Sequence, residues 1–96
     1  MKLQILDEAQ QDLIDGYQFY ELQRPGVGEY FLNSLFSDID SLQIYAGIHS
    51  VHSGYYRLLS KRFPFAIYYR MVRKVVKVHA ILDCRQDPAR IEKRLN

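Results

Sequence analysis

Residues 55–82 read YYRLLSKRFPFAIYYRMVRKVVKVHAIL, and this stretch decides the fold. Tyr55–Ser60 and Phe65–Arg70 are rich in aromatic and branched apolar residues, which favour strands. Val72-Arg73-Lys74 can close a hairpin into a third run, Val75–Leu82. The stretch therefore predicts three adjacent strands, and the third is long and apolar enough to lie centrally in the sheet.

The faces of the third strand follow from the alternation of its side chains. One face is expected to carry Val76, Val78, Ala80 and Leu82. The opposite face is expected to carry Val75, Lys77, His79 and Ile81.

Two helices are expected ahead of these strands. The first begins at Asp7, which has the spacing of a capping box with Gln10. Its apolar residues recur at helical spacing, at Ala9, Leu13, Tyr17 and Tyr20. Residues 23–28, QRPGVG, end this helix because proline cannot continue it.

A second apolar stripe predicts a helix from Val27 to about Tyr45. The stripe consists of Val27, Phe31, Leu35, Ile39 and Leu42, widened by Leu32 and Phe36. Because the link between the two helices is so short, they must pack antiparallel.

Shorter elements complete the chain. Leu3 and Ile5 alternate with polar residues, which predicts a strand before the first helix. Residues 46–54 are expected to form an irregular loop. Asp87 and Pro88 have the pattern of a helix cap followed by a first-turn proline, so residues 89–94 should form a short final helix.

The expected order is β-α-α-β-β-β-α, an α+β fold with a single domain over residues 1–96. Both helices must bury an apolar stripe, so the helical hairpin should cover one face of a mainly antiparallel sheet. With 96 residues, 48% of them apolar, the chain has the size of one domain with one core.

The net charge of +2 conceals a strong asymmetry along the chain. Residues 1–52 hold two basic and eight acidic side chains, whereas residues 53–96 hold eleven basic and three acidic ones. Such a split indicates that the second half meets an anionic partner, either a nucleic acid or an acidic protein segment. The alternative is that the acids line solvated helix faces while the cations protect sheet edges.

Several classes of function are not expected from this composition. Cys84 is the only cysteine, so it has no partner for an internal disulfide or a thiolate metal site. His49, His52 and His79 have no acid or cysteine at ligand spacing, and neither a metal nor a cofactor is expected. No segment reads as a signal peptide or a membrane span, which predicts a cytoplasmic protein.

Three features in this order resemble the ParE branch of the RelE/ParE toxin superfamily, whose members include plasmid stabilisation proteins. The first is the early helix with Tyr17–Glu21, YQFYE, followed by the helix through Phe31–Leu42. The second is Arg62–Tyr69, RFPFAIYY, and the third is Val78–Pro88, VHAILDCRQDP. None is specific alone, but the ordered set spans essentially the whole chain.

The resemblance implies the toxin of a type II toxin–antitoxin system, a growth inhibitor neutralised by a cognate antitoxin. Membership of the ParE branch implies a non-catalytic inhibitor of DNA gyrase. A hetero-oligomer of toxin and antitoxin is one expected form. The groove between the helical hairpin and the sheet is the expected dock, through helix-in-groove and strand-addition contacts.

A RelE-like endoribonuclease that cuts mRNA on the ribosome is the alternative. That chemistry needs no metal, only a base, an acid and cations for the phosphate. The candidates are Arg57, Lys61, Arg62 and Arg85 for the phosphate and His79 as acid or base. RelE-like nucleases present a tyrosine or a His-Tyr pair near the carboxyl terminus, whereas here the last tyrosine is Tyr69 and the last histidine is His79. A second alternative is an inactive homologue that only binds its antitoxin.

Contacts with antitoxin or target are expected from cations of the second half and from aromatic residues off the main stripes. The cations are Arg57, Lys61, Arg62, Arg85, Arg90 and Arg94, and the aromatic residues are Phe19, Phe63 and Phe65. The plainer interpretations are solubility charges for the cations, core packing for the rings and a partly buried strand residue for His79.

Overall fold

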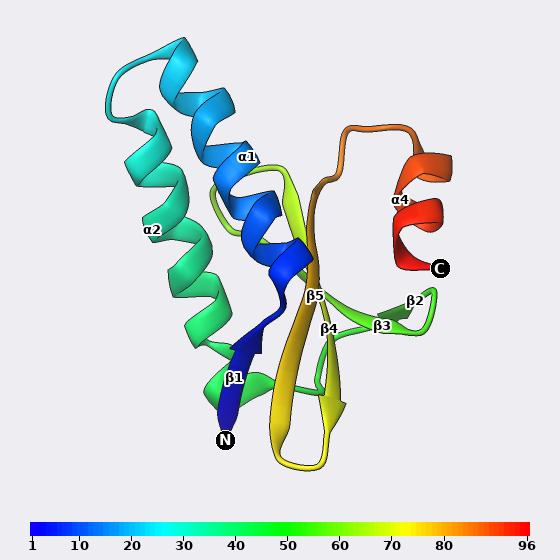
Figure 1. Ribbon diagram of the computed structural model, residues 1–96. Coiled ribbons are helices and arrows are strands. Elements are labelled where there is room, and N and C mark those ends of the chain that lie inside the picture. The colour runs from blue at the N-terminus through cyan, green and yellow to red at the C-terminus, as the bar shows by residue number, and fades with distance from the viewer.

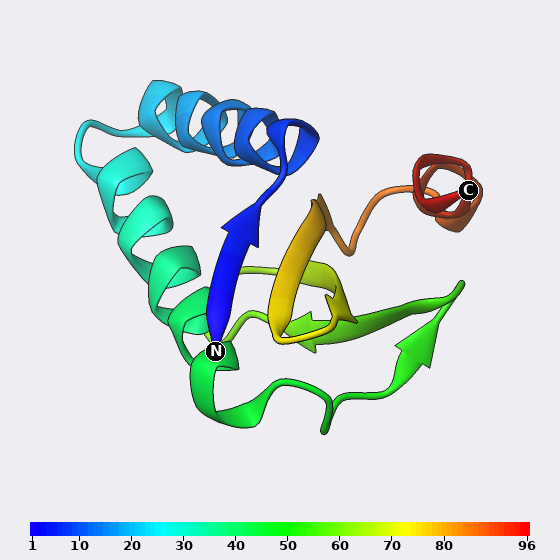
Figure 2. The ribbon, with the colours of Figure 1, turned by 60° about the horizontal axis from the view of Figure 1, so that its bottom comes forward.

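A five-stranded sheet carries a helical hairpin on one face and a short helix on the other in the computed structural model, which describes residues 1–96 (Figures 1 and 2). The elements in chain order are β1 (Lys2–Ile5), α1 (Asp7–Gln23), α2 (Val27–Asp40), α3 (Leu42–Tyr45), β2 (Val51–His52), β3 (Tyr55–Leu59), β4 (Phe65–Val72), β5 (Val75–Asp83) and α4 (Pro88–Leu95). The predicted α+β fold is confirmed. No helix is both long enough and apolar enough to cross a membrane.

The strands lie in the order β1-β5-β4-β3-β2. β1 runs parallel to β5, and the other neighbours are antiparallel. The three strands predicted between Tyr55 and Leu82 are therefore adjacent, and β5 lies inside the sheet between β1 and β4. The first strand of the chain pairs only with the last one, with Ile5 opposite Val78.

The hairpin is held closed at its tip by one carboxylate. Glu21 accepts the backbone N–H groups of Gly26 and Gly28 at 3.1 and 3.0 Å. Gly26 has a φ of +92°, which favours glycine. A Cβ on Gly28 would lie 2.7 Å from the carbonyl oxygen of Tyr17, so glycine allows α1 and α2 to approach closely here.

Each face of the sheet has its own apolar core. The larger core, against the hairpin, contains Leu13, Phe31, Leu35, Ile39, Ile67, Tyr69, Val76, Val78 and Ile81 among others. The smaller one, against α4, contains Tyr55, Ala66, Tyr68, Ala80, Leu82 and Leu95. Because α4 is short, it covers only part of this face of the sheet and leaves the remainder open to solvent.

The predicted faces of β5 are wrong in its second half. Tyr68 pairs with Ala80 but Tyr69 pairs with Val78, so His79 is an extra residue at a β-bulge. A bulge shifts the alternation by one residue. Val78 and Ile81 consequently share the hairpin side, while Ala80 and Leu82 turn towards α4.

Other details of the prediction also change. The second helix ends at Asp40, and a separate turn, α3, completes it. The segment expected as an irregular loop contains β2. The first helix begins at Asp7 as predicted, but its cap residue is Leu6, and Gln10 donates its side-chain N–H to the carbonyl of Ile5 at 2.8 Å instead of closing a capping box. The cap of α4 is confirmed, because Asp87 accepts the N–H of Ala89 at 2.9 Å.

A buried hydroxyl fixes the segment between α3 and β2. The Tyr69 side chain is fully buried and its ring stacks on Tyr56 with centroids 5.2 Å apart. Its hydroxyl oxygen accepts the N–H of Gly47 at 2.9 Å and forms a hydrogen bond with His49 Nδ1. Burial lowers the pKa of His49 below its usual value, which favours the neutral ring in this bond.

Candidate functional site

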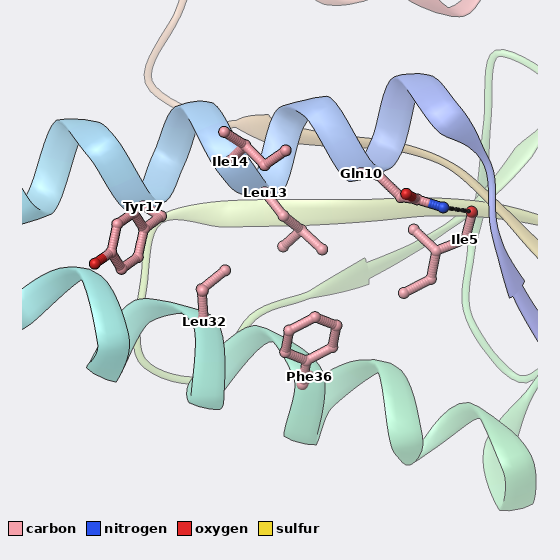
Figure 3. Close-up of a pocket in the computed structure, with 7 residues that line it drawn as sticks. All are labelled: Ile5, Gln10, Leu13, Ile14, Tyr17, Leu32 and Phe36. Atoms are coloured by element: carbon pink, nitrogen blue, oxygen red, sulfur yellow. Dashed lines mark hydrogen bonds between the residues drawn. The ribbon is translucent and has the colours of Figure 1, made fainter.

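An apolar groove, here called the hairpin groove, opens between α1 and α2 and ends at β1 (Figure 3). Its volume is about 430 Å³. The lining residues are Ile5, Gln10, Leu13, Ile14, Tyr17, Leu32 and Phe36. Ile14 remains 48% exposed and Phe36 42% exposed, so large apolar side chains face solvent here.

The groove forms because the apolar stripes of α1 and α2 are wider than the area that the sheet covers, so their outer residues stay exposed between the two helices. Leu13 and Tyr17 of α1 face Leu32 and Phe36 of α2 across it in Figure 3. Its single polar residue is Gln10, whose amide is engaged with the Ile5 carbonyl. This lining is suited to binding an apolar surface, such as one face of a helix, and carries no acid, base or nucleophile for catalysis.

A cluster of aromatic rings lies where α1, the start of α2 and the β3–β4 loop meet, and we call Phe19, Tyr20, Tyr30 and Phe63 the aromatic corner. Tyr20 lies 5.1 Å from Phe19 and 4.9 Å from Phe63, and Tyr30 lies 5.4 Å from Phe63, measured between ring centroids. Phe19 is 53% exposed and Tyr30 50% exposed. Rings anchored on one side and open on the other are typical of protein contact sites.

The three predicted aromatic residues thus come together around Tyr20, but in different settings. Phe19 is open to solvent, Phe63 is half-buried, and Phe65 is buried against Phe31 with centroids 4.9 Å apart. Sequence reasoning missed Tyr30. Tyr30 lies off the apolar stripe of the second helix, just as Phe19 lies off the stripe of the first. The same criterion that selected Phe19 could therefore have selected Tyr30.

Two of the predicted cations are neutralised by acids. Arg94 pairs with Asp12 at 2.7 Å and with Glu8 at 3.1 Å, and these bonds raise its pKa. Arg85 pairs with Asp83 at 2.8 Å, which lowers the pKa of that carboxyl. Arg94 therefore ties α4 to α1, and Arg85 fixes the chain after β5.

The other predicted cations lie apart from one another. Lys61 and Arg62 are exposed in the β3–β4 loop, next to the aromatic corner, and Arg90 is exposed on α4. Arg57 of β3 lines a cavity beneath α4 together with Tyr68 and Cys84. None of these four takes part in an ion pair.

His79 lies in a different cavity from Arg57. The centroid of its ring lies 5.0 Å from that of Tyr55. Burial lowers the pKa of His79, and the positive charges of Arg70 and Lys77 lower it further. The candidates for a ribonuclease site therefore do not converge. Arg57 and His79 line separate cavities, Lys61 and Arg62 lie in the β3–β4 loop, and Arg85 is held in an ion pair. No group of three His, Cys, Asp or Glu side chains is close enough to hold a metal ion.

Cations also line the sheet face opposite the hairpin, where sequence reasoning named Arg57 but missed Arg70 and Lys77. Arg70 lies 3.9 Å above the ring of Tyr55, on the side of the smaller core, and its Nε donates to the Gly54 carbonyl at 3.2 Å. Lys77 is opposite Arg70 in the β4–β5 ladder. No Asp or Glu occurs between Asp40 and Asp83 in the sequence. We call Arg57, Arg70 and Lys77 the basic sheet face.

No protein-family model and no curated protein matches this chain. A chain of the solved structure described as "Chromosomal ParDE TA system from P. aeruginosa" is similar to it, with 24% sequence identity and a TM-score of 0.77. The similarity covers 84% of this chain and 92% of that chain. The two proteins thus share a fold over most of their lengths.

Proposed function

We propose that this chain is the toxin of a type II toxin–antitoxin pair of the ParE kind, held inactive by a cognate antitoxin. The carrying observation is the shared fold with a chain of a ParDE toxin–antitoxin system, covering 84% of this chain and 92% of the other. The three ordered sequence features that resemble ParE toxins support the same proposal independently of the structure.

The hairpin groove is the proposed dock for an apolar helix of the antitoxin. Ile14 and Phe36 present apolar surface there that the chain itself leaves uncovered. A helix with apolar residues at i, i+3 or i+4, and i+7 would bury both side chains. The basic sheet face gives an acidic segment of the same antitoxin a complementary surface.

DNA gyrase is the proposed target, bound without catalysis in the cytoplasm. The aromatic corner with Lys61 and Arg62 beside it combines exposed rings and free cations, the composition of protein contact hot spots. The scatter of the ribonuclease candidates supports the inhibitor over a RelE-like nuclease, because phosphate cations and an acid or base must converge within hydrogen-bonding reach of one phosphate.

Induced expression with and without the neighbouring open reading frame tests this proposal. The expected result is growth arrest that the neighbour relieves, with inhibited supercoiling by purified gyrase and intact transcripts. If transcripts were cut during translation, gyrase inhibition would be wrong and the chain would be a RelE-like ribonuclease. Normal growth, together with tight binding of the neighbour's product, would indicate an inactive antitoxin-binding homologue.

A further inference from the structure

Arg57 is a partly buried arginine for which the fold supplies no anion. Its residue lies on β3 opposite Tyr68 of β4 and lines a cavity of about 280 Å³ closed on one side by α4. No carboxylate lies within ion-pairing distance of it. Its Nε is buried and has no hydrogen-bond partner.

Other arginines of the chain show what is unusual about Arg57. Arg94 and Arg85 each meet a carboxylate, and Nε of Arg70 donates to a backbone carbonyl. Burying an N–H of a charged group without an acceptor destabilises a fold, and native structures avoid it. Arg57 thus keeps a positive charge and an N–H donor that the chain itself does not satisfy.

The surroundings of Arg57 select the kind of acceptor. Tyr68 and Cys84 lie in the same cavity, and burial raises the pKa of both, so each stays neutral and adds no competing anion. The α4 side of the cavity is apolar at Ile91 and acidic at Glu92. One cation beside an acidic side chain suits a single negative charge better than a phosphate dianion.

We propose that the Arg57 cavity binds one carboxylate, an aspartate or glutamate side chain of the partner polypeptide, through the guanidinium of Arg57. This inference rests on the proposed function for the identity of that polypeptide as the antitoxin. The N–H groups of a guanidinium match the two oxygens of a carboxylate. Glu92 of α4 weakens the binding through like-charge repulsion.

The test is a titration of the isolated whole chain, followed through the arginine Nε–H signals in ¹⁵N NMR spectra. The probes are isobutyrate, as a carboxylate, and inorganic phosphate. The Arg57 signal is expected to shift saturably with isobutyrate in the millimolar range, and more weakly with phosphate. The Arg70 signal, already bonded to Gly54, should stay constant. A response of Arg57 that never saturates, or tighter binding of phosphate, overturns the proposal.

Two matched variants sharpen the result. Glu92→Gln should lower the dissociation constant for isobutyrate about threefold to tenfold, because it removes a like charge from the cavity wall. Glu29→Gln, on the exposed start of α2, changes the net charge equally and should leave the constant unchanged. Equal constants for the two variants contradict the proposal.

Arg57→Gln should abolish the saturable shifts that isobutyrate causes in the backbone amide signals of Tyr68 and Cys84. If that variant does not fold, the comparison of Glu92→Gln with Glu29→Gln decides alone. Growth arrest and neutralisation are measured separately in cells. Absence of saturable isobutyrate binding by the unsubstituted chain would thus refute the carboxylate site and leave the toxin proposal standing, whereas normal growth would refute the toxin proposal and leave the carboxylate site.

Discussion

Arg94 donates two hydrogen bonds to Asp12, from Nη1 to Oδ1 at 2.8 Å and from Nη2 to Oδ2 at 2.7 Å. The same carboxylate accepts the backbone N–H of Ile81 at 2.9 Å. One acid of α1 therefore holds both β5 and the last helix. The hairpin and α4, on opposite faces of the sheet, are linked through this group and through the ion pair of Arg94 with Glu8.

Removing that link should destabilise the protein in a graded way. Arg94→Ala is expected to lower the free energy of unfolding by about 1–2 kcal/mol, and Asp12→Ala by about 2–3 kcal/mol because the Ile81 N–H also loses its acceptor. Urea unfolding followed by circular dichroism measures both. Arg90→Ala, on the same helix but without an ion pair, is the control and should change stability by less than about 0.5 kcal/mol. Equal losses in Arg94→Ala and Arg90→Ala would show that the link contributes nothing.

A charge in the hairpin groove should separate neutralisation from toxicity. Phe36→Asp is expected to weaken antitoxin binding by about 30-fold or more, as for a contact hot spot, while growth arrest persists. Calorimetric titration of the purified antitoxin measures the change. Leu22→Asp places the same charge on an almost fully exposed leucine outside the groove and should bind normally. Unchanged binding by Phe36→Asp would rule out the groove as the dock.

The aromatic corner should show the opposite separation. Phe19→Ala combined with Tyr30→Ala removes two exposed rings and should reduce inhibition of gyrase at least tenfold while leaving antitoxin binding intact. Supercoiling assays at graded protein concentrations provide the measurement. Phe65→Ala is the structural comparison, since that ring is buried and its loss should cost about 3–5 kcal/mol of stability. If the double variant inhibited gyrase fully, the contact with the target would have to lie outside the aromatic corner.

Acid should destabilise the fold through His49 and His79. Burial lowers the pKa of both rings below the usual histidine value of 6.5. Between the folded and unfolded pKa values, the unfolded chain therefore binds more protons than the folded one. Stability from this source is complete above pH 6.5 and declines as the pH falls towards the folded pKa values. Urea unfolding at pH 7.5 and 5.5 should show the decline. The double variant His49→Gln with His79→Gln should flatten it, and an unchanged slope would assign the effect to other groups.

Local patterns of the sequence were sufficient for the order of the longer elements, but not for the short α3 and β2. Runs such as Phe65–Arg70 and stripes such as Phe31, Leu35 and Ile39 report their own secondary structure, because burial imposes periods of 2 and 3.6 residues. The bulge at His79 lay beyond this reasoning. Alternation assumes an uninterrupted pleat, and only the pairing of β5 with β4 reveals the extra residue.

The candidate site was less predictable, because it depends on contacts between distant residues. The charge split located most cations in the second half of the sequence, but it did not distinguish Arg94, which meets Asp12, from Arg57, which meets no acid. These are differences of tertiary packing. The groove was expected between the helical hairpin and the sheet, but the hairpin groove lies between α1 and α2 and meets the sheet only at Ile5.

The parallel pairing of β1 with β5 bears on the synthesis of the protein. Strand β1 has no neighbour in the sheet until β5, which is translated much later, has emerged from the ribosome. Ile5 forms one end of the hairpin groove, so the surface proposed to receive the antitoxin is completed only after β5 has been translated. A nascent chain cut short before Val75 would lack the strand that seats Ile5, and with it a finished groove.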